Sequence, residues 1–126
     1  MDLNVYFKSV IDQDTSPVVI CDLNHTIIYM NPSAVSRYAK RGGAALVGKS
    51  LLDCHSAESI DKINLVIDFF KNNEKHNIVY TYSNPKENCD VYMVALRDDN
   101  GSLIGYYEKH ESRNPEKRGC YELGEN

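Results

Sequence analysis

Two adjacent residues in the middle of the sequence, Cys54 and His55, have side chains that commonly bind metals or act as nucleophiles. Haem iron takes an axial histidine or an axial cysteinate, so either residue type suits that role. Adjacent residues on a loop or at a helix start rarely point the same way, so only one of the two could be an axial ligand. We take His55 as the candidate. The alternative is that its ring simply bonds to the backbone or to solvent beside a helix start.

The sequence lacks the motifs of an enzyme around this pair. It contains no glycine-rich phosphate loop, no GxSxG elbow and no HExxH helix, and the cysteine and histidine have no identifiable orienting partner. Asp98 and Asp99 are consecutive in a predicted hairpin, which indicates turn formation rather than a paired acid and base. We therefore predict that the protein is not an enzyme.

The composition indicates one acidic domain. At 126 residues, 42% of them hydrophobic, the chain is long enough to bury one core. Its net charge of -4, with 14 Lys and Arg scattered among 18 Asp and Glu, gives no footprint for nucleic acid or for an anionic membrane. No apolar run approaches the roughly 20 residues that span a bilayer, and the first residues are too polar for a signal peptide. We expect a cytoplasmic protein without nucleic-acid or membrane partners.

The first half of the sequence predicts a helix, a hairpin and a second helix. Apolar spacing favours a helix over residues 2–12, and β-branched runs favour strands at residues 17–22 and 26–30. His25 falls in the turn between these strands, so we interpret it as a turn residue rather than a ligand. Asn31, followed at once by proline, predicts the start of a short helix. Three cations after that start are interpreted as a solvated face: Arg37, Lys40 and Arg41.

The second half predicts a long amphipathic helix followed by three strands. Ser56 is the expected N-cap, and the apolar stripe of the helix contains Ile60, Ile63, Val66, Ile67, Phe69 and Phe70. Asn100-Gly101 predicts a type I′ hairpin, in which both residues have positive φ. The strands are expected at residues 76–83, 90–97 and 102–110.

This order of elements indicates an α+β fold with a five-stranded antiparallel sheet and helices over one face. In the strand at residues 90–97, however, both faces are apolar, whereas an antiparallel sheet with one solvated face alternates. Each face must then be covered. We expect the short helices on one face, and the N-terminal helix or a second subunit on the other.

Three segments in this order resemble the PAS domain, a sensor module of many bacterial signalling proteins: SPVVICDLNHTIIYMNPSA, LVGKSLLDC and ALRDDNGSLIGYYE. The resemblance covers about residues 15–110. It implies a PAS-like five-stranded antiparallel sheet, with short helices and one long helix on one face and an N-terminal helix. The expected division is an N-terminal helix at 1–14, a PAS domain at 15–112 and a flexible tail at 113–126.

Asp53-Cys54-His55 is similar to a PAS subgroup in which a histidine sits just before the long helix. This sequence has Ser56 where a proline is common in that subgroup. The cysteine motif of light-sensing flavin domains does not surround Cys54, so we discount that chromophore. The cofactor is left unknown, with haem and other small molecules as candidates.

The resemblance implies a pocket between the inner sheet face and the short helices. The residues expected to line it, beside His55, are Tyr29, Val35, Tyr38, Leu46, Leu52, Ile63, Ile67, Tyr80, Met93 and Tyr106. The alternative is that these side chains only pack against one another.

Three functions follow from the resemblance. The first is a sensory domain that binds a small apolar or planar ligand and relays the signal through protein contacts. The second is a ligand-free module for homodimerisation or interaction, and the third is a haem sensor that uses His55. The expected partners are a second copy of the chain and a signalling protein such as a histidine kinase or a transcriptional regulator.

Overall fold

The computed structural model describes residues 1–124. Its helices are α1 (Leu3–Asp12), α2 (Pro32–Arg37) and α3 (Ala57–Asn72), with 3-10 helices η1 (Ala39–Arg41), η2 (Gly43–Leu46) and η3 (Leu51–Cys54). Its strands are β1 (Val19–Asp22), β2 (Ile27–Met30), β3 (Ile78–Asn84), β4 (Cys89–Arg97) and β5 (Leu103–Ser112).

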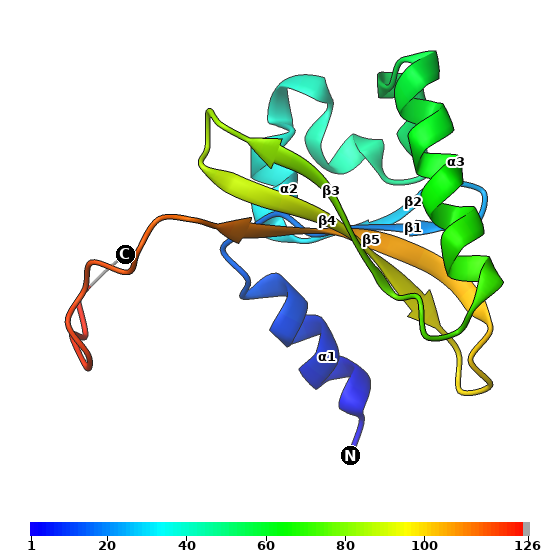
Figure 1. The fold of residues 1–126 in the computed structure, drawn as a ribbon. Coiled ribbons are helices and arrows are strands. Elements are labelled where there is room, and N and C mark those ends of the chain that lie inside the picture. The colour runs from blue at the N-terminus through cyan, green and yellow to red at the C-terminus, as the bar shows by residue number, and fades with distance from the viewer. Residues whose placement is uncertain (125–126) are drawn as a thin grey trace.

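The five strands form one antiparallel sheet in the order β2-β1-β5-β4-β3. Helices α2 and α3, with the 3-10 helices, lie over one face, which we call the inner face (Figure 1). Helix α1 extends away from the sheet on the other side (Figure 1). The predicted α+β architecture, with its long helix and N-terminal helix, is confirmed.

The side chain of Asn31 links several segments near the start of the domain through hydrogen bonds. Its side-chain oxygen accepts hydrogen bonds from the backbone N–H of Ala34, which caps α2, and of Val18, both at 2.9 Å. Its amide nitrogen donates to the carbonyls of Ile11 at 3.0 Å and Ser16 at 3.1 Å. The side chain is fully buried, and these bonds satisfy it there. The cap predicted from the sequence therefore also links α1 to the hairpin.

The core lies between α3 and the inner sheet face. Ser56 caps α3 by accepting from the Ser59 N–H, as predicted. At Gly105 of β5 an added Cβ would lie 2.2 Å from the Cys21 carbonyl oxygen, so a side chain cannot fit between the two strands there. The buried apolar residues that contact one another in this core are Val19, Cys21, Ile27, Met30, Ala34, Ile63, Ile67, Phe70, Met93 and Tyr106.

The predicted type I′ turn at Asn100-Gly101 is wrong in its geometry. Gly101 has φ +82°, but Asn100 does not have positive φ. The Asp98 carboxylate accepts from the backbone N–H groups of Asn100 at 2.9 Å and Ser102 at 3.0 Å, and the Gly101 N–H donates to the Asp98 carbonyl. Asp98 thus favours a longer loop that needs positive φ only at the glycine. In the first hairpin, the positive φ of +64° falls on His25.

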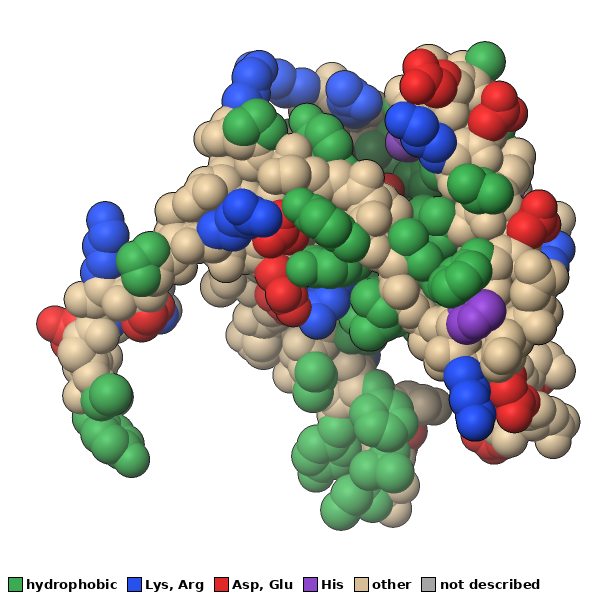
Figure 2. Space-filling view, in the orientation of Figure 1, with side chains coloured by type: hydrophobic (Ala, Val, Ile, Leu, Met, Phe, Trp, Pro, Cys, Tyr) green, Lys and Arg blue, Asp and Glu red, His purple; other side chains and the backbone are tan. Residues whose placement is uncertain are grey.

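Helix α1 does not cover the outer sheet face. It has no buried residue, and it exposes Leu3, Val5, Tyr6, Phe7 and Val10 by 53–73%. Hydrophobic side chains cover much of this projecting helix (Figure 2). Of the two covers expected for this face, the N-terminal helix and a second subunit, α1 of the same chain does not provide one, and a second subunit stays a prediction. None of the described helices has the length and the apolar character that a membrane span requires.

Candidate functional site

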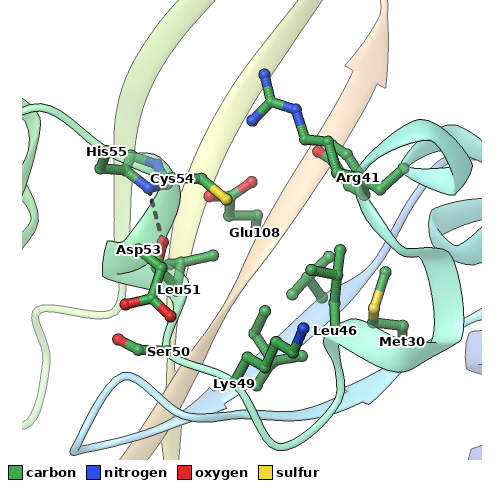
Figure 3. A pocket seen from close by; sticks show the side chains of 13 residues that line it. Met30, Arg41, Leu46, Lys49, Ser50, Leu51, Asp53, Cys54, His55 and Glu108 are labelled. Atoms are coloured by element: carbon green, nitrogen blue, oxygen red, sulfur yellow. Dashed lines mark hydrogen bonds between the residues drawn. The ribbon is translucent and has the colours of Figure 1, made fainter.

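Two adjoining hollows lie between the helices and the inner sheet face. The first, here called the helical cavity, has a volume of about 380 Å³ and is lined from the 3-10 helices, β1, β2 and β5 (Figure 3). The second, the α3 groove, has about 650 Å³ and is lined from α3 and strands β3–β5. Tyr38, His55 and Glu108 line both hollows, which places these residues at the junction. Hollows of this size are typical of small-molecule sites.

The helical cavity combines apolar walls with a polar rim. Exposed charged residues that line it come from the loops and short helices: Arg41, Lys49 and Asp53. Its apolar walls are Val19, Ile27, Met30, Leu46 and Leu51. Such a hollow would accept an apolar molecule and orient it by a few polar contacts.

Glu108 is the acidic group at the junction of the hollows. It follows the buried Tyr106 by two residues on β5, so it shares the inner face. Its carboxyl group points into the cavity (Figure 3). Its side chain is 24% exposed, and because the residue lines both hollows, that open surface faces the cavity. Burial raises the pKa of Glu108, and the nearby His55 opposes this shift in part.

His110 is the next residue on the same face of β5. Its side chain is 10% exposed, and its Nε2 is buried with no hydrogen-bond partner within residues 1–124. This nitrogen lies 3.9 Å from Glu108 Oε2, which is too far for a hydrogen bond. Burial lowers the pKa of His110, and Arg37 contributes to the same shift, so the neutral ring is favoured at pH 7. The α3 groove thus contains a buried nitrogen that lacks a partner.

His55 follows η3 and is half-buried. Its Nδ1 lies 2.8 Å from the Leu51 carbonyl oxygen. Because a carbonyl oxygen only accepts, Nδ1 is assigned the proton, which leaves the lone pair of Nε2 free. The backbone bond considered from the sequence is therefore present. Haem ligation by the free Nε2 stays a prediction.

The predicted lining residues divide into two groups. Beside His55, those that line a hollow are Tyr38, Leu46, Ile63, Tyr80 and Met93. Those that pack in or against the core without lining either hollow are Val35, Leu52, Ile67 and Tyr106.

Tyr29 lies on the opposite face of the sheet. It pairs with Ile20, whose neighbours Val19 and Cys21 point into the core, so strand alternation turns Tyr29 outward. Its hydroxyl donates to the Asp12 carboxylate at the end of α1. This placement excludes Tyr29 from the two hollows.

The sequence analysis missed Glu108 and His110. The signal was a period of two along the last strand, where Tyr106, Glu108 and His110 share one face and that face is otherwise apolar. The short basic cluster is exposed, as the interpretation of a solvated face requires, and Arg41 within it also lines the rim of the helical cavity, which the sequence did not indicate.

Comparison with known families agrees with this architecture. The sequence pattern of one family, described as PAS domain, matches residues 10–110. The chain belongs to the PAS domain family. PAS domains are sensory and signalling modules. No protein of curated function matches the chain in sequence.

Solved PAS structures share the fold at low sequence identity. The PAS domain of a protein from Colwellia psychrerythraea has a TM-score of 0.65 and 15% identity, over 88% of this chain and 97% of that one. A sensory box sensor histidine kinase from Vibrio cholerae has a TM-score of 0.59 and 15% identity, over 85% and 89%. The Aer2 receptor from Vibrio cholerae, described as a dual PAS-heme oxygen sensor, has a TM-score of 0.56 and 17% identity, over 79% of this chain and 95% of that one.

Proposed function

We propose that this PAS domain is a sensor that binds a small, largely apolar molecule in the helical cavity and relays binding to a signalling partner. The observation that supports it is the junction of the two hollows, where the Glu108 carboxyl is partly open to both and His110 Nε2 is buried beside it with no hydrogen-bond partner in residues 1–124. A core that only packed against itself would cover such groups with hydrogen-bond partners. The similarity to a sensor histidine kinase supports a kinase as the class of partner.

The test is native mass spectrometry of the purified full chain, with thermal shifts across a panel of metabolites and haem. We expect a bound mass that denaturation removes, or a saturable stabilisation by one panel member. Leu51→Trp should abolish either signal because the indole fills the helical cavity. Ile28→Trp, on an exposed site of β2 outside both hollows, is the control. Absence of both signals from the wild type would contradict the proposal.

A second candidate function is homodimerisation through α1. Its exposed side chains Tyr6, Phe7 and Val10 form an apolar strip, and the outer sheet face presents Tyr92 and Tyr107 only half-buried. A second copy of the chain would cover both surfaces, which supports the expectation of a dimer.

Light scattering on the full chain tests this candidate. The wild type should be a dimer, and Phe7→Ser combined with Val10→Ser should yield a monomer. Leu65→Ser, at a 69% exposed site on α3, should leave the dimer intact. A monomeric wild type, or a dimer that persists in the double variant, would refute dimerisation through α1.

Haem is the third candidate, and the free Nε2 of His55 supports it. The surroundings fit it less well, because Glu108 and His110 place polar groups where a porphyrin presents an apolar face. A haem titration should show a Soret shift that His55→Ala removes and Cys54→Ala preserves. A titration with no shift would exclude haem binding.

A further inference from the structure

Glu108 and His110 together restrict the chemistry of the ligand. Within the part of the chain that the structure describes, the partner of Glu108 at ion-pair distance is His110 rather than a lysine or arginine. Burial disfavours the protonated form of His110. At pH 7 the neutral ring therefore supplies no positive charge to the Glu108 carboxylate. An ionised carboxylate inside a cavity without a cation is costly, and a cation from outside would offset that cost.

The spacing of the two groups suits one bridging atom. Glu108 Oε2 and His110 Nε2 are 3.9 Å apart. A donor at a normal hydrogen-bond length of about 2.9 Å from each atom would span this distance. His110 Nε2 has almost no exposed surface in this structure, so the imidazole ring has to turn to admit the donor. A neutral imidazole can accept at Nε2, and a carboxylate accepts at both oxygens, so the bridging atom must be a donor with two hydrogens. A nitrogen of an amidinium, guanidinium or ammonium group meets this requirement.

The cations at the rim do not reverse this preference. Arg41 and Lys49 are exposed, so water and salt screen them. Glu108 lies in a less polar environment, where a charge interacts more strongly with a ligand. The apolar walls formed by Met30, Leu46 and their neighbours would hold the remainder of the molecule.

We infer that the junction of the helical cavity and the α3 groove is selective for a small, largely apolar cation whose nitrogen bridges Glu108 and His110 Nε2. This inference rests on the proposed function and names the chemical class of its ligand. The amidinium group is the best match, because it meets a carboxylate with two parallel N–H···O bonds.

Three probes of similar shape test the charge requirement: benzamidine, benzamide and benzoate. Calorimetric titration of the full chain at pH 7.5 should show saturable binding of benzamidine, at least about tenfold tighter than benzamide. Benzoate should not bind. Glu108→Gln should weaken benzamidine at least about tenfold and leave benzamide unchanged, since only the charged contact is lost.

Matched variants separate the deep carboxylate from the rim. Asp53→Asn removes an exposed carboxylate from the rim of the same cavity and should leave benzamidine binding unchanged. His110→Phe, which keeps a ring but removes Nε2, should weaken benzamidine several-fold. Thermal melts of each variant would verify that it is folded.

The results distinguish this inference from the proposed function. Benzamide or benzoate binding as tightly as benzamidine would overturn the cation preference while supporting a ligand cavity. Failure of all three probes would also overturn the cation preference, and the mass spectrometry and thermal panel would then decide the proposed function separately. Equal loss of benzamidine in Asp53→Asn and Glu108→Gln would overturn the assignment to Glu108.

Discussion

Glu108 Oε2 lies 3.9 Å from His110 Nε2 on the inner face of β5, and no hydrogen bond joins them. The histidine nitrogen has no other partner in residues 1–124. An unsatisfied buried polar group costs about 1–3 kcal/mol. The unpartnered nitrogen therefore lowers the stability of the domain at the place where a ligand would contact it, as is common for functional sites.

Glu108→Gln should raise the melting temperature at pH 7.5. Burial raises the pKa of Glu108 in the folded state. The stability that the protonated Glu108 carboxyl contributes is therefore fully present below about pH 4.5 and is lost as the pH rises through the folded-state pKa. Glutamine does not titrate. The melting-temperature gain of the variant should therefore shrink towards zero as the pH falls to about 4. The residues lining the two hollows with this carboxyl that also titrate or are charged are Arg37, Tyr38, Arg41, Lys49, Asp53, Cys54, His55, Lys62, Tyr80, Tyr82 and His110.

Melts of both proteins between pH 4 and 8 measure this difference directly. Glu122→Gln, an exposed change in the tail, is the control and should track the wild type throughout. A gain that does not vary with pH, or a loss of stability at pH 7.5, would show that Glu108 is ionised without cost in the folded state.

Asn31→Ala should lower the free energy of unfolding by about 2–4 kcal/mol, because a buried hydrogen-bond network loses its centre. The change removes the acceptor of the Val18 and Ala34 N–H groups and the donor to the Ile11 carbonyl. Urea denaturation measures the loss. Asn72→Ala, at an exposed site on α3, should stay within about 0.5 kcal/mol of the wild type.

Gly105→Ala should prevent stable pairing of β1 with β5. The new Cβ would lie 2.2 Å from the Cys21 carbonyl oxygen, and a backbone atom cannot move aside as a side chain can. We expect a melting temperature far below that of the wild type or no cooperative transition. Gly119→Ala, where no atom lies within 4 Å of the added carbon, is the control. An unchanged melt in Gly105→Ala would contradict the described strand contact.

Arg97→Lys should destabilise the end of α3 by about 1–3 kcal/mol, because an ammonium cannot reproduce a planar guanidinium that bonds several carbonyls. Arg97 donates to the carbonyls of Phe70 at 2.7 Å, His76 at 3.1 Å and Gly101 at 3.0 Å. Amide hydrogen exchange should rise at the C-terminal turn of α3. Arg113→Lys, at an exposed side chain whose ion pair with Asp90 measures 2.8 Å, should change little.

The fold was predictable because its signals are local and agree with one another. Asn31 with Pro32 marked the start of α2, and Ser56 with the stripe through Ile63 and Ile67 marked α3. The turn at residues 98–102 was less predictable, because an Asp98 side chain competes with the Asn-Gly preference and selects a longer loop.

The candidate site was only partly predictable. His55 was found because its residue type is rare and chemically distinctive, whereas Glu108 and His110 appear in the sequence as ordinary charged residues of a strand. Their importance arises from packing, which places them between α3 and the short helices. The sequence left the partner of α1 open between its own sheet and a second subunit, because an apolar stripe shows that a helix needs a partner but not where that partner lies.

The most direct test of the ligand cavity is an ¹⁵N–¹H NMR titration of the full chain with benzamidine. Saturable shifts should concentrate at the amides of His55, Glu108 and His110, and Glu108→Gln should strongly reduce them. Amides of Val5 and Phe7 on α1 should not move. Shifts confined to α1 and the outer sheet face, or none at any concentration, would contradict a cation-selective cavity on the inner face of β5.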